Sequence, residues 1–167
     1  VYCFGATAVA GLVMMHFFGW DVLSTGFSKP NWESGLLFMG PMGNINLTSY
    51  FVTVALVLAA GIYITRQQFP FDRYGAVTLS CFALMLWAEL NLNTDAGIVA
   101  LGVVLLAGMP LMLISMHRLG RYLAVLSVAL GVIAFNRLVV ETWILEEDFG
   151  KPGYFMICAA ILLAAAS

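Results

Sequence analysis

The sequence predicts an all-α protein, a polytopic transmembrane helical bundle that forms a single domain over residues 1–167. Two features of its composition predict this: 62% of the residues are hydrophobic and only 10% are charged, which gives a mean hydropathy of +0.98. A soluble domain carries about a quarter charged residues and exposes roughly a third of its unfolded surface. So much apolar surface would be exposed in water that we expect lipid to surround the protein.

The third observation is the length of the apolar runs. A helix rises about 1.5 Å per residue, so about 20 residues cross the roughly 30 Å of hydrocarbon in a bilayer. Five runs have this length, and a partial one ends the chain, which predicts about six spans. They are Val1–Trp20, Leu47–Thr65, Tyr74–Leu90, Ala96–Met116, Tyr122–Val140 and the partial Gly153–Ser167. Because the first run begins at once with Val1, we expect the chain to extend upstream, and the last helix to continue or to tilt.

Charge predicts the orientation of these spans. The connections 66–73 and 117–121 hold four of the seven Lys and Arg residues. By the positive-inside rule both are cytoplasmic. The connections 21–46, 91–95 and 141–152 then face outward. Three tryptophans near the predicted outer boundary agree with this orientation, namely Trp20, Trp87 and Trp143. The segment 21–46 is apolar at its centre but too short to span, so we expect an outer interfacial loop.

A tandem two-helix repeat is one interpretation of the middle of the chain. Arg73 and Arg121, 48 residues apart, begin the similar stretches Arg-Tyr-Gly-Ala-Val and Arg-Tyr-Leu-Ala-Val. Shared apolar composition with two ordinary Arg-Tyr boundary anchors is the other interpretation. In either case Glu89 and Arg137, each 16 residues beyond its arginine, lie at the same depth on parallel helices. An ion pair between them would offset much of the unfavourable free energy of placing a charged side chain in a membrane.

Polar residues gather at the predicted outer level, and they form the candidate ligand site. They are Asp21, Glu89, Asn91, Asn93, Asp95, Asn136, Arg137 and Glu141. One interpretation is a polar vestibule that binds a small ion or polar solute. The other is that these residues are simply solvated at the ends of helices. Glu141, one turn beyond Arg137, would then pair with it locally, and Asp95 would lie near the N-cap of a helix. Glu89, whose side chain is short, and Arg137 fit the second interpretation least well.

Several classes of function are disfavoured. The net charge of −2 and the lack of a basic run argue against nucleic acid as a partner. Familiar hydrolase, zinc-protease, dithiol and phosphate-loop motifs are missing, which argues against a hydrolase, a zinc protease or a disulfide oxidoreductase and leaves enzymes of other classes open. His16 and His117 lie near opposite faces and so do not form a two-histidine haem site, although His16 alone is a weak candidate metal ligand. The sequence predicts no particular cofactor.

Three hypotheses about function remain. The first is a non-catalytic subunit or accessory component of a larger membrane assembly, with the bilayer and other membrane subunits as partners. It is favoured by small residues spaced four apart, as in the pairs Ala6 and Ala10, Ala55 and Ala59, and Ala76 and Ser80. The second is a small-solute or ion transporter or channel with an outward-facing polar site that includes Glu89 and Arg137. The third is a redox subunit that carries a cofactor at His16.

Overall fold

The computed structural model describes residues 2–20, 22, 42, 44–66, 72–92, 94–144 and 150–166, and for 141–144 and 150–156 it describes the backbone alone. This part of the chain contains α-helices and no strand, so the predicted all-α class is confirmed. The helices are α1 (Tyr2–Phe17), α3 (Ile45–Thr65), α4 (Arg73–Asn91), α5 (Asp95–Met112), α6 (Met116–Asn136), the π-helical continuation η1 (Arg137–Ile144) and α7 (Gly150–Ala166). Most of the predicted interfacial loop 21–46 lies outside the described residues.

Three of the described helices are long and apolar enough to cross a membrane. They are Ile45–Thr65, Asp95–Met112 and the stretch Met116–Val140, which joins α6 to the start of η1. The stretches Tyr2–Phe17 and Ile157–Ala166 are apolar but shorter. These helices support integration into a membrane, while the total of about six spans stays a prediction.

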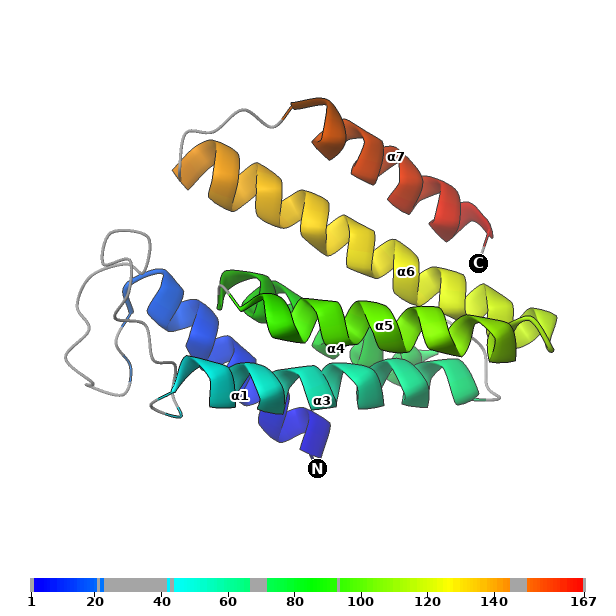
Figure 1. Ribbon diagram of the computed structural model, residues 1–167, viewed down its shortest axis with the longest axis horizontal. Coiled ribbons are helices and arrows are strands. Elements are labelled where there is room, and N and C mark those ends of the chain that lie inside the picture. Colours follow the sequence, from blue (N-terminus) through cyan, green and yellow to red (C-terminus); the bar gives the residue numbers. More distant parts are fainter. Residues whose placement is uncertain are drawn as a thin grey trace.

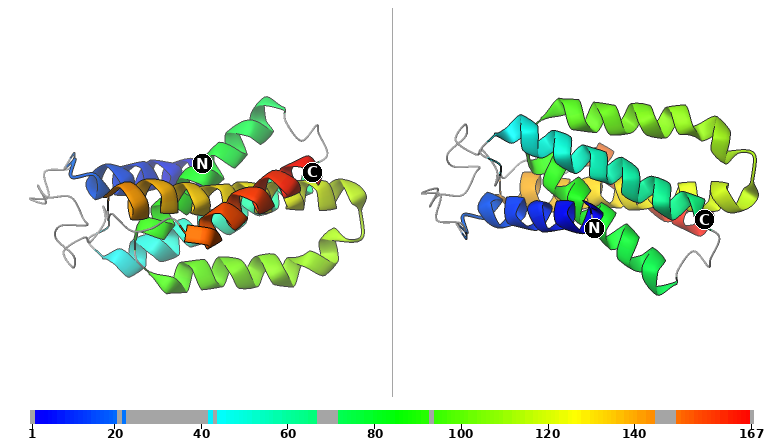
Figure 2. Two further views of the ribbon diagram at one scale, coloured as in Figure 1. Left: turned by 90° about the horizontal axis from the view of Figure 1, so that it is seen from above. Right: turned by 90° about the horizontal axis from the view of Figure 1, so that it is seen from below.

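Neighbouring helices alternate in direction, so the bundle has two ends. Figure 1 shows α1, α4 and α6 ending where α3 and α5 begin, and α7 lying along α6. We call this end the Glu89 end, and the opposite end, where α3 ends and α6 begins, the Arg121 end. Figure 2 shows α5 at the side of the bundle next to α3. Between α6 and α7, the Ser127 hydroxyl donates a hydrogen bond to the carbonyl oxygen of Ala160 at 2.7 Å.

The predicted connection 117–121 is wrong, because these residues form the first turns of α6. Ser115 has extended backbone angles (φ −141°, ψ 124°), and its carbonyl oxygen accepts a 2.9 Å hydrogen bond from the Leu119 amide. The preceding helix ends at Met112 rather than Met116, soon after Pro110, which lacks an amide donor. The connection between the two helices is therefore shorter than expected, and its basic residues belong to a helix.

Small residues pack α1 and α3 into the core as the four-residue spacing predicts. Ala6, Ala10, Ala55 and Ala59 are at most 1% exposed. Such residues let helix backbones approach closely. The third pair differs, since Ala76 and Ser80 lie on an exposed face of α4.

The two Arg-Tyr pairs of the proposed repeat have different surroundings. Tyr74 is 70% exposed and follows the exposed Arg73, whereas Arg121 and Tyr122 are 2% and 4% exposed. One pair begins a helix at its surface, and the other lies inside the bundle one turn after a helix start. The two arginines are therefore not equivalent boundary anchors, whatever the origin of the sequence similarity.

Candidate functional site

Glu89 lies in the last turn of α4 and has no solvent exposure. It is the acidic side chain buried most deeply among the described residues. Removing a carboxylate from water costs free energy unless hydrogen bonds or an opposite charge compensate for the lost hydration. The groups around Glu89 therefore decide what this part of the bundle can do.

Hydroxyl groups from two neighbouring elements surround the carboxylate. Ser49 on α3 donates a hydrogen bond to Glu89 Oε1. Thr94, which precedes α5, donates to Ser49 Oγ at 2.7 Å and lies 3.3 Å from Glu89 Oε1. Thr53, one turn beyond Ser49 on the same face of α3, adds a third hydroxyl that is 7% exposed. Among the described residues, Glu89 Oε2 and Thr53 Oγ1 have no hydrogen-bond partner.

Gly97 lets α5 approach the carboxylate closely. A Cβ atom built at this position would overlap Glu89 Oε1 and Thr53 Oγ1. Gly97 and Leu101 are also the buried residues of α5. The carboxyl of Glu89 therefore rests directly on the first turn of α5, at a point where no larger residue fits.

The start of α5 is also an electrostatic feature of the site. The first amides of a helix lack intrahelical acceptors, and the helix dipole places partial positive charge there. The Thr94 side chain makes no capping hydrogen bond to these amides, because it is turned toward Ser49 and Glu89. The dipole and the hydroxyl donors favour the carboxylate form, and burial favours the neutral acid.

A second polar network lies beside the carboxylate, between α4 and α6. Asn136 Oδ1 accepts hydrogen bonds from Trp87 Nε1 at 3.0 Å and from Asn91 Nδ2 at 2.8 Å. Asn91 Nδ2 also lies 2.7 Å from the Trp87 carbonyl oxygen and 3.9 Å from Met14 Sδ on α1. These contacts show that the ends of α1, α4 and α6 lie at one level, which for α4 and α6 agrees with their equal spacing from the arginines.

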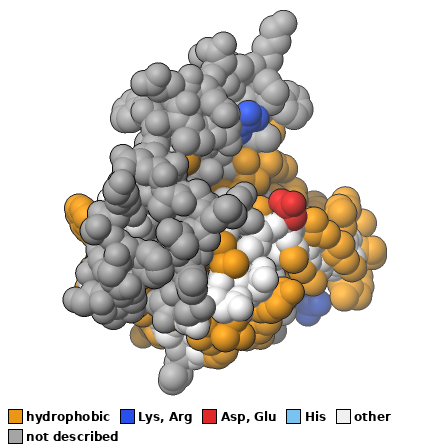
Figure 3. All heavy atoms as spheres, turned by 60° about the vertical axis from the view of Figure 1, so that its left-hand side comes forward, with side chains coloured by type: hydrophobic (Ala, Val, Ile, Leu, Met, Phe, Trp, Pro, Cys, Tyr) orange, Lys and Arg blue, Asp and Glu red, His pale blue; other side chains and the backbone are white. Residues whose placement is uncertain are grey.

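The structure brings only part of the predicted site together. Asn91 and Asn136 are in direct contact, but Arg137 is not among the hydrogen-bond or ion-pair partners of Glu89. Asp95 is exposed at the start of α5. Figure 3, which looks toward this side of the molecule, shows acidic atoms at the surface next to hydrophobic side chains. Asp21, Asn93 and the side chain of Glu141 lie outside the described residues.

His16 is 5% exposed near the end of α1, so it is a packed residue rather than an interface residue. Within the described ranges, no group of three or more His, Cys, Asp or Glu side chains lies close enough to hold a metal ion. His16 therefore stays the weak candidate ligand that the sequence suggests, and the described residues do not place it in a group of three such side chains.

Sequence reasoning missed four residues that contact or adjoin Glu89: Ser49, Thr53, Thr94 and Gly97. The spacing of Ser49 and Thr53 places both on one face of α3, and this was the available signal. Hydroxyl residues are common in membrane helices, so the pattern alone is not specific. Nothing in the sequence distinguishes Gly97 from the other glycines of the same helix.

Comparison of the chain with protein-family models, with curated proteins and with solved structures found no match. The class of protein therefore rests on fold and site alone. It is an α-helical protein whose described part contains three helices long and apolar enough to span a membrane, and which has a buried carboxyl among hydroxyl groups at one end of the bundle.

Proposed function

We propose that the protein transports a small cation across a membrane and that Glu89 is its binding group. The observation that carries this proposal is the complete burial of the Glu89 carboxyl, one oxygen of which has no hydrogen-bond partner among the described residues. Placing an ionisable group inside a membrane bundle costs free energy, and such groups commonly mark ion pathways and proton relays. A purely structural carboxyl would be expected to satisfy both oxygens, because an unsatisfied buried polar atom lowers stability.

The surroundings of Glu89 favour a cation of single charge. One carboxylate supplies one negative charge, and Ser49, Thr53 and Thr94 supply neutral oxygen atoms. Oxygen ligands suit protons and hard metal cations. This proposal keeps the outward-facing polar site of the second sequence hypothesis but centres it on hydroxyl groups instead of Arg137.

Glu89→Gln is expected to abolish cation transport while leaving the fold intact. Glutamine keeps the shape of the side chain and removes its charge, so binding of a cation loses its counter-charge. The measurement is charge movement on a solid-supported membrane, after concentration jumps of sodium, potassium or protons across proteoliposomes.

The matched control is Tyr50→Phe, an exposed position next to Ser49 on α3. This variant is expected to transport like the parent protein. If Glu89→Gln melts at the parent temperature and still carries the parent current, transport through Glu89 is disproved.

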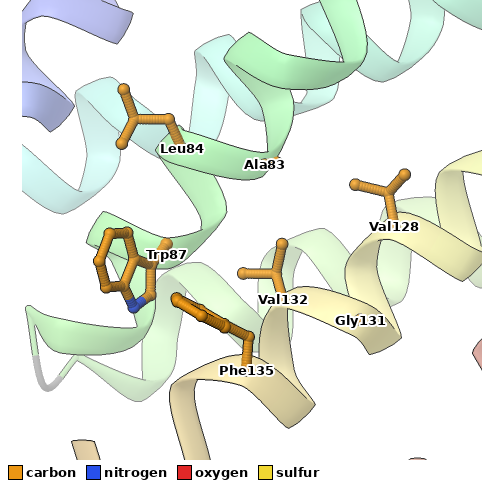
Figure 4. A pocket seen from close by; sticks show the side chains of 7 residues that line it. All are labelled: Ala83, Leu84, Trp87, Val128, Gly131, Val132 and Phe135. Atoms are coloured by element: carbon orange, nitrogen blue, oxygen red, sulfur yellow. The ribbon is translucent and has the colours of Figure 1, made fainter. Parts of the chain in front are cut away.

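As a second candidate function we propose a subunit of a larger membrane assembly, on the evidence of an apolar groove between α4 and α6. The groove has a volume of about 300 Å³. Figure 4 shows that Ala83, Leu84 and Trp87 line it from α4 and Val128, Gly131, Val132 and Phe135 from α6. Small residues at Ala83 and Gly131 would let the backbone of a partner's transmembrane helix approach closely.

Gly131→Phe is expected to remove a stoichiometric membrane partner during purification from native membranes. A Cβ atom at Gly131 meets nothing within 4 Å, so the new ring enters the groove and leaves the fold of the chain in place. Gly102→Phe on α5, where a Cβ also meets nothing within 4 Å, is the control and should retain the partner. Equal recovery of the partner with both variants would rule out this groove as the interface.

A further inference from the structure

The hydroxyl groups beside Glu89 form a continuous hydrogen-bonded chain that leads out of the bundle. Ser49 Oγ donates to Glu89 Oε1, and Thr94 Oγ1 donates to Ser49 Oγ at 2.7 Å. Glu89 and Ser49 have no exposed surface, whereas Thr94 is partly exposed and is followed by the exposed Asp95. The chain therefore links a buried carboxyl to the surface at the Glu89 end.

We propose that the ligand of this site is a proton, and that Glu89 exchanges it with water at the Glu89 end through Ser49 and Thr94. This inference rests on the proposed cation transport and names its substrate. A hydroxyl can accept a proton on its oxygen while it gives up its own, so a chain of hydroxyls passes a proton without any atom travelling. A metal ion would have to displace the same close contacts.

The proton balance of the exchange is simple. A hydronium ion at the surface gives a proton to Thr94 Oγ1, Thr94 gives its own proton to Ser49 Oγ, and Ser49 gives its proton to Glu89 Oε1. The products are one water molecule and a neutral glutamic acid, and both hydroxyls are restored. The reverse sequence releases the proton.

Opposing influences around Glu89 allow it to hold a proton and to release it. Complete burial favours the neutral acid, while the Ser49 and Thr94 hydroxyls and the first turn of α5 favour the carboxylate. The titratable groups on the neighbouring elements are His16 on α1, Asp95 on α5 and Arg137 after α6, and none of these is a hydrogen-bond or ion-pair partner of Glu89. Among the described residues, no fixed opposite charge in contact with Glu89 therefore locks it in one state.

Within the part of the protein that the structure describes, the chain of hydroxyl groups opens toward the Glu89 end and not toward the Arg121 end. Beyond Thr53, the side of α3 that faces the core continues with Leu56, Ala59 and Ala60, which are at most 4% exposed. Apolar side chains offer no acceptor for a proton. The structure thus corresponds to a state in which the site communicates with the Glu89 end, and transfer to the Arg121 end requires a second arrangement of the helices.

The test is infrared spectroscopy of the purified full chain in a maltoside detergent, which has no ester carbonyl. A protonated glutamic acid gives a carbonyl band that disappears as pH rises, and we expect Glu89→Gln to lack this band. After transfer into heavy water the band shifts as the acid proton exchanges. We expect Thr94→Val to slow this exchange at least about tenfold, because it removes the hydroxyl that contacts both Ser49 Oγ and Glu89 Oε1 and so interrupts the relay.

Thr65→Ala is the matched control, since it removes a hydroxyl of the same helix that donates to the Gly61 carbonyl oxygen at the Arg121 end, and its exchange rate should equal that of the parent. Equal exchange rates in the parent and Thr94→Val would overturn the relay. A band that sodium removes at constant pH would overturn the proton as ligand, and so would the lack of any Glu89-dependent band. A Glu89-dependent band in a protein without transport activity would instead refute the proposed function and leave the proton site standing.

Discussion

Gly97→Ala is expected to lower the free energy of unfolding by about 1–3 kcal/mol, as overpacking of a close contact does. The added Cβ atom would occupy the space of Glu89 Oε1 and Thr53 Oγ1. Glu89 Oε1 cannot move away freely, because the Ser49 and Thr94 hydroxyls hold it. Either α5 moves outward or the carboxyl leaves its hydroxyl partners, and both changes weaken the Glu89 end.

The matched control for this prediction is Gly102→Ala on the same helix. A Cβ atom at Gly102 meets nothing within 4 Å, so the substitution should be neutral or should stabilise the helix by up to about 1 kcal/mol. Equilibrium unfolding of the two variants in one detergent, followed by tryptophan fluorescence, gives the comparison. Equal stability of the two variants would mean that α5 does not rest on the Glu89 carboxyl.

The positions of the helices can be predicted from the sequence, because a segment surrounded by hydrocarbon has few backbone conformations available to it. Each apolar run of suitable length coincides with a helix, since a backbone in hydrocarbon must satisfy its own hydrogen bonds. The boundary at 112–121 was missed for an equally local reason. The basic residues at 117–121 predict a connection, but a charged residue can occupy the first turns of a helix as well as a loop, and Ser115 begins the helix there.

The sequence predicts the depth of the polar residues along the bundle, but it does not predict which side chains they contact. Counting residues from Arg73 and Arg121 places the ends of α4 and α6 at one depth, and the hydrogen bond between Asn91 and Asn136 agrees with that. Depth says nothing about the direction in which a side chain points around its helix. Glu89 points toward α3 and α5, where it meets Ser49, while Asn91 meets α6. An ion pair between Glu89 and Arg137 needed a rotation of α4 that spacing alone does not specify.

Arg121 is a further case in which depth and surroundings differ, and its side chain is the largest of those fully buried among the described residues. Its Nη1 donates a 2.8 Å hydrogen bond to the Tyr63 carbonyl oxygen, and its guanidinium carbon lies 5.5 Å from the centre of the Tyr63 ring. Tyr63 is in the last turn of α3, where carbonyls lack an intrahelical donor. The arginine therefore caps the C-terminal end of α3 and places positive charge at the negative end of the helix dipole.

Arg121→Ala is expected to lower the free energy of unfolding by about 2–4 kcal/mol, because it leaves a cavity and removes the donor to Tyr63. Arg121→Met should lower it by only about 1 kcal/mol or less, since methionine fills most of the volume and no charge has to be buried. The exposed Arg118 provides the control, and Arg118→Ala should stay within about 0.5 kcal/mol of the parent. Unfolding in detergent measures all three variants.

The order of the three variants in free energy of unfolding shows whether packing or charge stabilises the Arg121 end. Nε and Nη2 of Arg121 have no partner among the described residues, so part of the guanidinium is buried without compensation. If packing dominates, Arg121→Met will be far more stable than Arg121→Ala. If the two variants are equally unstable, the hydrogen bond and the charge at the end of α3 decide the stability instead, and the volume of the side chain contributes little.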